Sequence, residues 1–303
     1  MTSKITVKKR WQLSRYVDAV VSAGGGNAVA ATSQITGIVW DGCVHGLMGA
    51  GQIEAEIEVE TGIADLCCLD EGQFIAGADD GSVRVVHSGG VLPLPGGHNS
   101  NVNSVAVSSS KKLVASGGQD KAVLCWNLNE PSNEPMRFEG HIDSVNSVDW
   151  NTTGDNLLTA SSDGMACVWD ERQNHWQAAI TIPTGLDVYS AVFAASGTTM
   201  VMSTEMMDVV AFDLRAETKA LWRKGGYTGA SHCLRASPHN EKIVAVASNC
   251  PAVTLLDVSN GNVLGKSFHH TDYVRSVAWD SQAEGRLFSG SWDKSVAELN
   301  VSL

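Results

Sequence analysis

The sequence predicts an all-β fold, a single propeller of seven four-stranded blades closed into a ring by its N-terminal strand. Short apolar runs alternate with Gly, Asp and Asn turn residues, as expected of strands joined by tight turns. A pattern of strand ends recurs about every 43 residues along the 303-residue chain, which is typical of a propeller. The last repeat lacks a fourth strand, and a β-prone segment at the start of the chain can supply it.

The most regular repeat spans residues 140–170. Gly-His opens it, Asp163 lies 22 residues after His141, and Trp169 follows six residues later. This pattern resembles a WD40 repeat, in which these side chains and a second-strand hydroxyl form a buried hydrogen-bonded chain. The predicted network residues are His98, Ser116, Asp120 and Trp126 in blade 3, His141, Thr159 (or Ser161), Asp163 and Trp169 in blade 4, and His270, Ser289 and Asp293 in blade 7.

The repeat ends divide the chain into seven units within one domain, residues 1–303. The expected Trp positions are Trp40, Val86, Trp126, Trp169, Phe212, Leu256 and Leu299. The turn six residues earlier has Asp in four blades (Asp80, Asp120, Asp163 and Asp293) and Gln34, Met206 and Cys250 in the others. Blades are therefore expected to end near residues 60, 95, 138, 181, 224, 268 and 303, with blades 3, 4 and 7 regular and the rest degenerate.

The two chain ends are predicted to meet in blade 7. Residues 295–299 form its third strand, and only four residues follow. Residues 5–11 are β-prone and precede the first strand of blade 1, so they are expected to form the outer strand of blade 7. Closure of this kind removes an open sheet edge that would invite aggregation.

Composition and charge exclude several classes of protein. A net charge of −12 argues against direct nucleic-acid binding, which needs a clustered positive field, and favours basic partners. The seven cysteines are scattered without a C-x-x-C pair, as in a reduced intracellular protein. We find no secretory signal and no 18-residue apolar run, so we expect no membrane contact and a cytoplasmic and nuclear location.

The histidines explained by the repeat leave no metal-ligand spacing, and no G-x-S-x-G or Cys-His signature occurs. We therefore expect no enzyme, no metal and no cofactor. A catalytic propeller with a site assembled from distant blades is the less favoured alternative.

Three stretches carry a narrower resemblance. They are Ser33-Gln34-Ile35-Thr36-Gly37-Ile38-Val39-Trp40, the run Glu60-Thr61-Gly62-Ile63-Ala64-Asp65-Leu66 with Asp80-Gly81-Ser82-Val83, and His270-Thr271-Asp272-Tyr273-Val274-Arg275 with Trp292-Asp293. In order and spacing they resemble the methylosome protein 50 family, the WD-repeat subunits that partner a type II protein arginine methyltransferase. The resemblance implies a non-catalytic scaffold in a hetero-oligomer, which docks the enzyme and presents basic substrates such as histone tails and Sm proteins. The C-terminal stretch also resembles peroxisomal targeting-signal receptors, so a generic WD40 adaptor or peptide-signal receptor is the alternative function.

Five residues are candidates for partner binding. The resemblance implies that Trp40 contacts the enzyme, although at the blade Trp position it would only close a core. Trp292 precedes the turn at Asp293, so it is expected either to line the channel mouth or to pack against the loop around Asn249 and Cys250. The remaining candidates are Glu54, Glu56 and Glu58, one face of an alternating strand that would form either a docking strip or a solvated rim.

Overall fold

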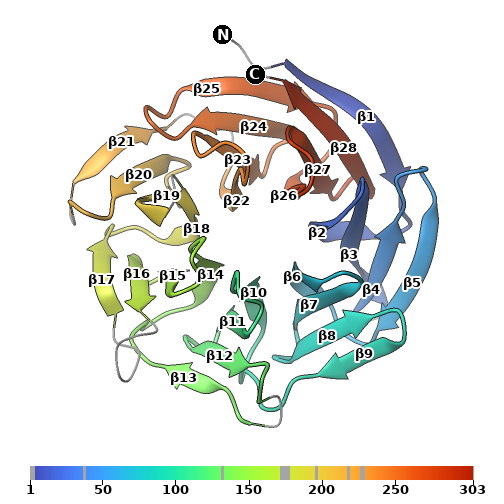
Figure 1. The fold of residues 1–303 in the computed structure, drawn as a ribbon, viewed down its shortest axis with the longest axis horizontal. Helices are drawn as coiled ribbons and strands as arrows, with labels where there is room; N and C mark the ends of the chain where they lie inside the picture. The colour runs from blue at the N-terminus through green and yellow to red at the C-terminus, as the bar shows by residue number, and fades with distance from the viewer. Residues whose placement is uncertain are drawn as a thin grey trace.

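The structure is a computed structural model that describes residues 4–36, 39–130, 133–170, 178–194, 197–216, 219–225 and 229–302. Its regular elements are 28 β-strands, arranged as seven four-stranded antiparallel sheets around a central channel (Figure 1). The predicted all-β, seven-bladed fold is therefore confirmed. No helix among the described residues is long and apolar enough to span a bilayer.

Each blade runs from an innermost to an outermost strand. Blade 1 holds β2 (Tyr16–Gly24), β3 (Asn27–Thr36), β4 (Val39–Leu47) and β5 (Ile53–Val59); blade 2 holds β6 (Ile63–Asp70), β7 (Gln73–Ala78), β8 (Val83–His87) and β9 (Gly90–Pro93). Blade 3 holds β10 (Val102–Val107), β11 (Leu113–Gly118), β12 (Val123–Asn127) and β13 (Met136–Phe138); blade 4 holds β14 (Val145–Trp150), β15 (Asn156–Ser161), β16 (Met165–Asp170) and β17 (Ala178–Pro183). Blade 5 holds β18 (Val188–Ala194), β19 (Thr199–Thr204), β20 (Val209–Asp213) and β21 (Ala220–Lys224); blade 6 holds β22 (Ser231–Ala236), β23 (Ile243–Ser248), β24 (Ala252–Asp257) and β25 (Val263–Phe268). Blade 7 holds β26 (Val274–Trp279), β27 (Arg286–Ser291), β28 (Ser295–Ser302) and β1 (Lys4–Gln12).

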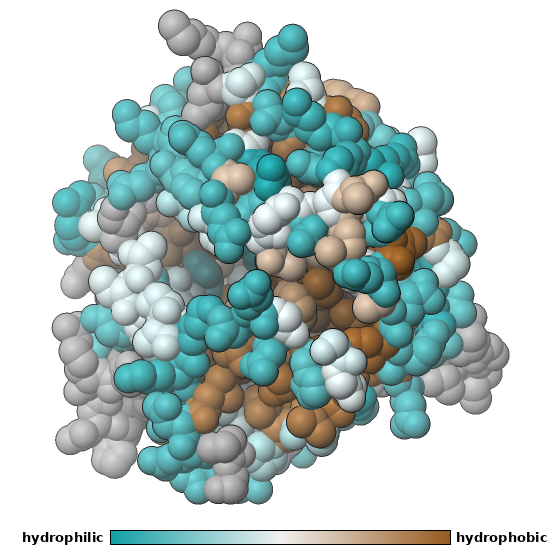
Figure 2. Space-filling model, turned by 45° about the vertical axis from the view of Figure 1, so that its right-hand side comes forward, coloured by the Kyte–Doolittle hydropathy of each residue, from teal (hydrophilic) through white to brown (hydrophobic). Residues whose placement is uncertain are grey.

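Apolar side chains fill the spaces between neighbouring blades. One cluster, for example, joins Val123 and Phe138 of blade 3 to Val145 and Trp169 of blade 4. Strand side chains alternate between the two faces of a sheet, so each blade packs against both neighbours. Hydrophilic side chains cover most of the outer surface seen in Figure 2.

The first and last strands of the chain pair in blade 7. β1 runs antiparallel to β28, from Lys4 opposite Ser302 to Gln12 opposite Ser295, and the two lie side by side in Figure 1. Trp11 of β1 is 2% exposed and packs with Phe288 of β27, their ring centroids 6.3 Å apart. This strand thus joins the chain ends through both its backbone and a buried side chain.

Blade 1 departs from the predicted register. Gln34, the expected turn residue, lies within β3 and pairs with Asp41, and the hairpin continues to the pair Thr36–Val39. Leu47 lies 13 positions after Gln34, whereas Trp126 of blade 3 lies six positions after Asp120. The β3–β4 hairpin therefore extends beyond the end at which the other blades turn.

Trp40 consequently does not close the core of blade 1, and its assignment to the blade Trp position is wrong. The pairing places Leu47 there: Ala30 pairs with His45 as Ser116 pairs with Leu124, and Leu47 and Trp126 each follow two residues later. Leu47 is fully buried, whereas Trp40 is 42% exposed. Both belong to β4, but Trp40 stands near its start on the extended hairpin.

Candidate binding site at the channel mouth

A ring of small polar side chains lines the central channel on the innermost strands. Ser104, Ser147, Ser190 and Ser276 occupy one position in blades 3, 4, 5 and 7, and Cys233 occupies it in blade 6. Each of the four serine hydroxyls accepts a hydrogen bond from a backbone N–H of the next blade at 3.2–3.3 Å. These bonds tie neighbouring blades together at the centre of the ring.

Blade 2 carries Asp65 at this position. Its Oδ2 atom accepts hydrogen bonds from the Val105 N–H at 3.0 Å and the Ser104 hydroxyl at 2.9 Å, and its Oδ1 atom accepts one from the Leu66 N–H at 2.9 Å. Asp65 therefore joins blades 2 and 3 as the serines join other blades. It also brings a negative charge to a place where a neutral hydroxyl makes the same inter-blade bond elsewhere.

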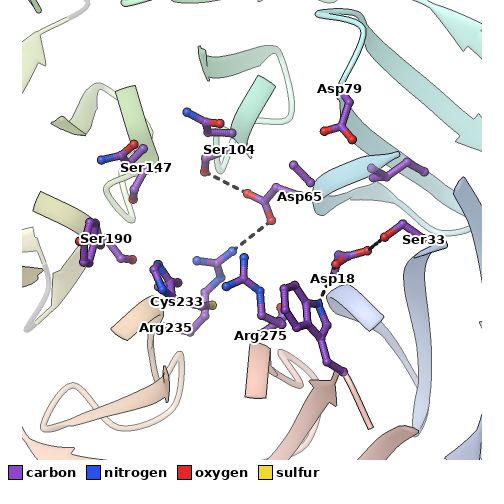
Figure 3. Close-up of a pocket in the computed structure, with 18 of the residues that line it drawn as sticks. Asp18, Ser33, Asp65, Asp79, Ser104, Ser147, Ser190, Cys233, Arg235 and Arg275 are labelled. Carbon is purple, nitrogen blue, oxygen red and sulfur yellow. Dashed lines mark hydrogen bonds and ion pairs between the residues drawn. The ribbon is translucent and has the colours of Figure 1, made fainter. Parts of the chain in front are cut away.

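Arg235 of β22 places a positive charge opposite Asp65. Its guanidinium Nη2 lies 3.5 Å from Asp65 Oδ1, and its Nη1 donates to the Leu234 carbonyl at 3.0 Å. In Figure 3 the ion pair crosses the channel between blades 6 and 2. Asp149 of blade 4 lies deeper, where burial raises its pKa to about 6 although the charge of Arg235 opposes the shift.

A second arginine, Arg275 of β26, enters the same cavity. Its guanidinium lies 5.0 Å from the centre of the Trp292 ring, a cation–π distance. Its Nε atom is buried and has no hydrogen-bond partner among the described residues. Burial lowers the pKa of Arg275, and the Asp18 carboxylate opposes that shift. Arg275 is thus a partly buried cation whose buried Nε atom lacks a hydrogen-bond partner among the described residues.

Trp292 is held by blade 1 and by two tyrosines. Its indole N–H donates to Asp18 Oδ1 at 3.0 Å, and its ring lies 6.2 Å from that of Tyr16 and 6.1 Å from that of Tyr273. The Ser33 hydroxyl also donates to Asp18. Trp292 lines the cavity, and these partners replace the expected packing against the loop around Asn249 and Cys250.

Trp40 and Asp79 form the blade 1 and blade 2 side of the mouth. A Cβ at Gly62 would lie 3.5 Å from the Cβ of Trp40 and would collide with the Asp79 carboxylate where it now stands, so a larger residue would require Asp79 to move. The Asp79 carboxylate accepts one long contact, from Asn101 Nδ2 at 3.5 Å, and its pKa is raised mainly by burial. Asp79 is therefore a carboxylate with weak internal partners.

These groups surround a cavity of about 450 Å³ at the channel mouth (Figure 3). The lining residues are Asp18, Ser33, Trp40, Ile63, Ala64, Asp65, Asp79, Asn103, Ser104, Asn146, Ser147, Ser162, Tyr189, Ser190, His232, Cys233, Arg235, Arg275, Ser276 and Trp292. The cations come from blades 6 and 7 and most of the carboxylates from blades 1 and 2. Burial and the nearby Arg275 lower the pKa of His232 to about 4, so this imidazole is neutral at pH 7.

The His–Asp networks hold the loops around this mouth. In blade 4, His141 Nδ1 lies 2.8 Å from Asp163, His141 Nε2 lies 2.7 Å from the Thr159 hydroxyl, and the Trp169 indole N–H donates to that hydroxyl at 2.9 Å. Thr159, not Ser161, therefore supplies the hydroxyl of this hydrogen-bonded network. Ser161 instead donates to the Asp143 carbonyl at 3.1 Å.

Blade 3 has a shorter network. His98 bridges Asp120 and Ser116, both at 2.7 Å, but Trp126 donates to the Pro95 carbonyl at 2.8 Å. The expectation that Trp126 completes this chain is wrong. Thr159 and Ser116 hold equivalent places, so the second-strand position alone does not decide whether the indole joins the chain.

In blade 7, His270 bridges Asp293 at 3.0 Å and Ser289 at 2.9 Å. A second histidine, His269, also reaches the Ser289 hydroxyl at 2.9 Å. Leu299 stands at the Trp position of this blade and has no N–H group to donate from its side chain, so the hydrogen-bonded network ends at Ser289.

The glutamate strip lies on β5, the outer strand of blade 1. Glu58 forms an ion pair with Arg15 at 2.9 Å, and Glu56 lies 3.4 Å from His45 Nδ1. Arg15 also reaches Asp41 of β4 at 3.1 Å, so it bridges two strands. Glu54 is exposed and forms no ion pair with the described residues. Glu54, Glu56 and Glu58 lie on the outer rim, away from the cavity.

The repeats match a known family. The sequence pattern described as "WD domain, G-beta repeat" matches residues 91–127, 133–170 and 261–297, which end on the third strands of blades 3, 4 and 7. These three segments are WD40 repeats. The matched segments are also those in which a His–Asp pair holds a loop beside the mouth.

Several named proteins are similar in sequence to this chain. The chain is 28% identical over 216 residues to a subunit of chromatin assembly factor 1 from Saccharomyces cerevisiae, a match that covers 65% of this chain and 42% of the relative. It is 25% identical over 215 residues to human striatin-4, covering 66% of this chain and 28% of the relative. It is 24% identical over 242 residues to the peroxisomal targeting signal 2 receptor of Schizosaccharomyces pombe, covering 76% and 77%. The chain spans less than half the length of the first two relatives.

Sequence reasoning missed the central charges. Asp65, Arg235 and Arg275 were not predicted as site residues, because a single charged residue in an apolar strand is an ordinary observation. The signal was positional: Arg275 lies 43 residues after His232, which lies 43 residues after Tyr189, and all three line the cavity. Comparison of each innermost-strand position across all blades would have found all three.

Proposed function

We propose that this WD40 propeller is a non-catalytic adaptor that docks a partner protein through the extended β3–β4 hairpin of blade 1. The observation that carries the proposal is Trp40, an indole that is 42% exposed on a hairpin longer than those of the other blades. Exposed tryptophans that a partner can cover are frequent anchors of protein interfaces. The Cβ of Trp40 lies next to Gly62, the residue before the first strand of blade 2, so the base of the Trp40 side chain lies against blade 2.

At a finer level we propose that the partner is a type II protein arginine methyltransferase. Support comes from the three stretches that resemble the methylosome protein 50 family, the first of which forms the extended hairpin. The relatives described above are named for chromatin assembly, striatin and peroxisomal targeting, so this assignment depends on those stretches. In such a complex the propeller would present basic substrates, such as histone tails and Sm proteins, in the cytoplasm and the nucleus.

The proposed contact with basic substrates involves Glu54, Glu56 and Glu58. Glu56 and Glu58 remain largely exposed, at 60% and 68% of their side chains, even though each has an internal partner. Glu54 adds an exposed carboxylate on the same strand. An acidic strip on an acidic protein attracts cationic segments and speeds their association.

The test is co-purification of the tagged chain and its Trp40→Ala variant from its own cells, followed by mass spectrometry and an assay of symmetric arginine methylation. The variant is expected to fold normally and to lose the methyltransferase. Phe268→Ala is the matched control, because Phe268 is 73% exposed on the outer strand of blade 6. Retention of the enzyme by Trp40→Ala would contradict the anchor. Recovery of a different partner whose binding depends on Trp40 would support the adaptor proposal and contradict the methyltransferase proposal.

A peptide-signal receptor is the second candidate. Two observations favour it: the 450 Å³ cavity at the mouth, and the match to a targeting-signal receptor over 77% of that relative. In that case cavity variants, rather than Trp40→Ala, would abolish capture of the partner.

A further inference from the structure

The cavity contains two opposite charges with few internal partners. Arg275 stands on blade 7 with a buried Nε atom that has no hydrogen-bond partner among the described residues, and Asp79 stands on blade 2 with one contact at 3.5 Å. Among the described residues no ion pair joins these two side chains. Buried charges are costly unless they are paired, so each is suited to a ligand group of the opposite sign.

Arg235 is a second cation in the cavity. In Figure 3 the side chains of Arg235 and Arg275 both point into the cavity. Asp65, the ion-pair partner of Arg235, already accepts three hydrogen bonds from Ser104, Val105 and Leu66. Some N–H groups of Arg235 can therefore donate to a ligand while Asp65 keeps its three other hydrogen bonds. Two guanidinium groups can together bind a carboxylate through several charge-assisted hydrogen bonds.

The fold does not need these charges at the centre. Ser104, Ser147, Ser190 and Ser276 make the same inter-blade bond as Asp65 with a neutral hydroxyl. Asn103 and Asn146 line the cavity at the position that Arg275 occupies in blade 7, and they donate to the backbone carbonyls of Val145 and Val188. Neutral side chains thus serve the propeller in blades 3, 4 and 5, whereas blades 1, 2, 6 and 7 carry charges that face the cavity.

We propose that this cavity, which we call the mouth site, binds an extended peptide segment in which an acidic residue stands next to a basic one. The acidic side chain binds Arg275 and Arg235, and the basic side chain binds Asp79 beside the Trp40 ring. Neutral His232 and the polar Asn103 and Asn146 supply hydrogen bonds to the peptide backbone. The mouth site shares Trp40 with the proposed docking hairpin, but Arg275, Arg235 and Asp79 have no role in that docking, so variants of these three residues test the mouth site independently.

The experiment observes the arginine side chains directly. The full chain labelled with ¹⁵N is titrated with acetyl-Gly-Lys-Glu-Gly-amide and acetyl-Gly-Glu-Lys-Gly-amide, and the Nε–Hε signals are followed by NMR. Those of Arg275 and Arg235, assigned by their absence from Arg→Gln variants, are expected to shift with at least one residue order. Replacing Glu by Gln in the peptide is expected to weaken binding at least about tenfold, because a charge-assisted hydrogen bond is lost.

Variants of the protein complete the test. Arg275→Gln is expected to weaken binding about tenfold or more, whereas Arg215→Gln is expected to change nothing. Arg215 is the matched control because it is an exposed arginine that pairs with Asp213 after the third strand of blade 5, at the end of the ring opposite the mouth. Asp79→Asn is expected to weaken binding of the Lys-containing peptide and to leave unchanged a peptide with Gln in place of Lys.

Three results would overturn the mouth site. One is an equal response to the Glu and Gln peptides in the unaltered protein, a comparison that does not depend on any variant folding. Another is the absence of a shift up to about 10 mM peptide, a concentration that detects even very weak binding. The third is a response of the arginine signals to inorganic phosphate with no response to the Glu peptide, which would make the cavity an unspecific anion site. Loss of the methyltransferase by Trp40→Ala would affect none of these readouts.

Discussion

The indole N–H of Trp292 donates a hydrogen bond to the Asp18 carboxylate at 3.0 Å, across the seam between the last and first blades. β1 and β28 join the two chain ends within blade 7, at the outer rim of the ring. The ring is therefore closed at two radii, by a strand pair within blade 7 on the outside and by a side-chain pair between blades 7 and 1 beside the channel.

Trp292→Phe is expected to lower the free energy of unfolding by about 1–2 kcal/mol, because Asp18 loses a donor in a site where burial already raises its pKa. The aromatic contacts with Tyr16 and Tyr273 are kept by Phe. Urea denaturation measures the loss, and Tyr273→Phe is the control, with a change expected within about 0.5 kcal/mol. Equal stability of Trp292→Phe and the unaltered protein would show that the inner fastening contributes nothing.

Trp11→Ala is expected to destabilise the ring by about 3–5 kcal/mol, since it empties a fully buried aromatic site between blades 7 and 1. The indole also donates to the Met48 carbonyl at 3.3 Å, which the variant loses. Thermal unfolding is the measurement. Lys8→Ala on the exposed part of the same strand serves as control and should leave the midpoint unchanged; equal midpoints for all three proteins would refute the closure role of Trp11.

The regular blades were predictable because their polar networks fix the spacing of His, Asp and the strand-ending residue. Blade 1 was not, because its extended hairpin places Trp40 where an evenly spaced repeat expects the strand-ending residue. A tryptophan there gave a false register, and fully buried Leu47, an unremarkable residue in sequence, holds the true position. Arg235 and Arg275 escaped prediction for a related reason: their role depends on side chains from distant blades, such as Asp65, which lies 170 residues before its partner Arg235 in sequence.

Loss of the hydroxyl in the polar networks is expected to cost more in blade 4 than in blade 3. Thr159→Val leaves both the Trp169 N–H and His141 Nε2 without a partner, whereas Ser116→Ala leaves only His98 Nε2. An unsatisfied buried polar group costs about 1–3 kcal/mol, so we expect about 2–4 kcal/mol for Thr159→Val and about 1–2 kcal/mol for Ser116→Ala. Urea denaturation of the two variants compares them directly, and equal losses would mean that the indole bond adds no stability.

Asp149 is expected to make the protein less stable as the pH rises from about 4 to about 6. Burial raises the pKa of this carboxyl to about 6, above its ordinary value of 3.8. Between those values the native state holds a proton that the unfolded chain has released, so the free energy of unfolding falls with rising pH and is constant above the window. Two pKa units correspond to about 2.7 kcal/mol, and channel water is expected to reduce the effect to about 1–2 kcal/mol.

Asp149→Asn keeps an oxygen to accept the hydrogen bond that the Phe193 N–H donates at 2.8 Å, so it removes the titration with little other change. Urea denaturation of both proteins from pH 4 to pH 7 should therefore show the variant gaining stability relative to the unaltered chain across this window. A constant difference between the two would mean that Asp149 is ionised in the native state throughout, held so by Arg235.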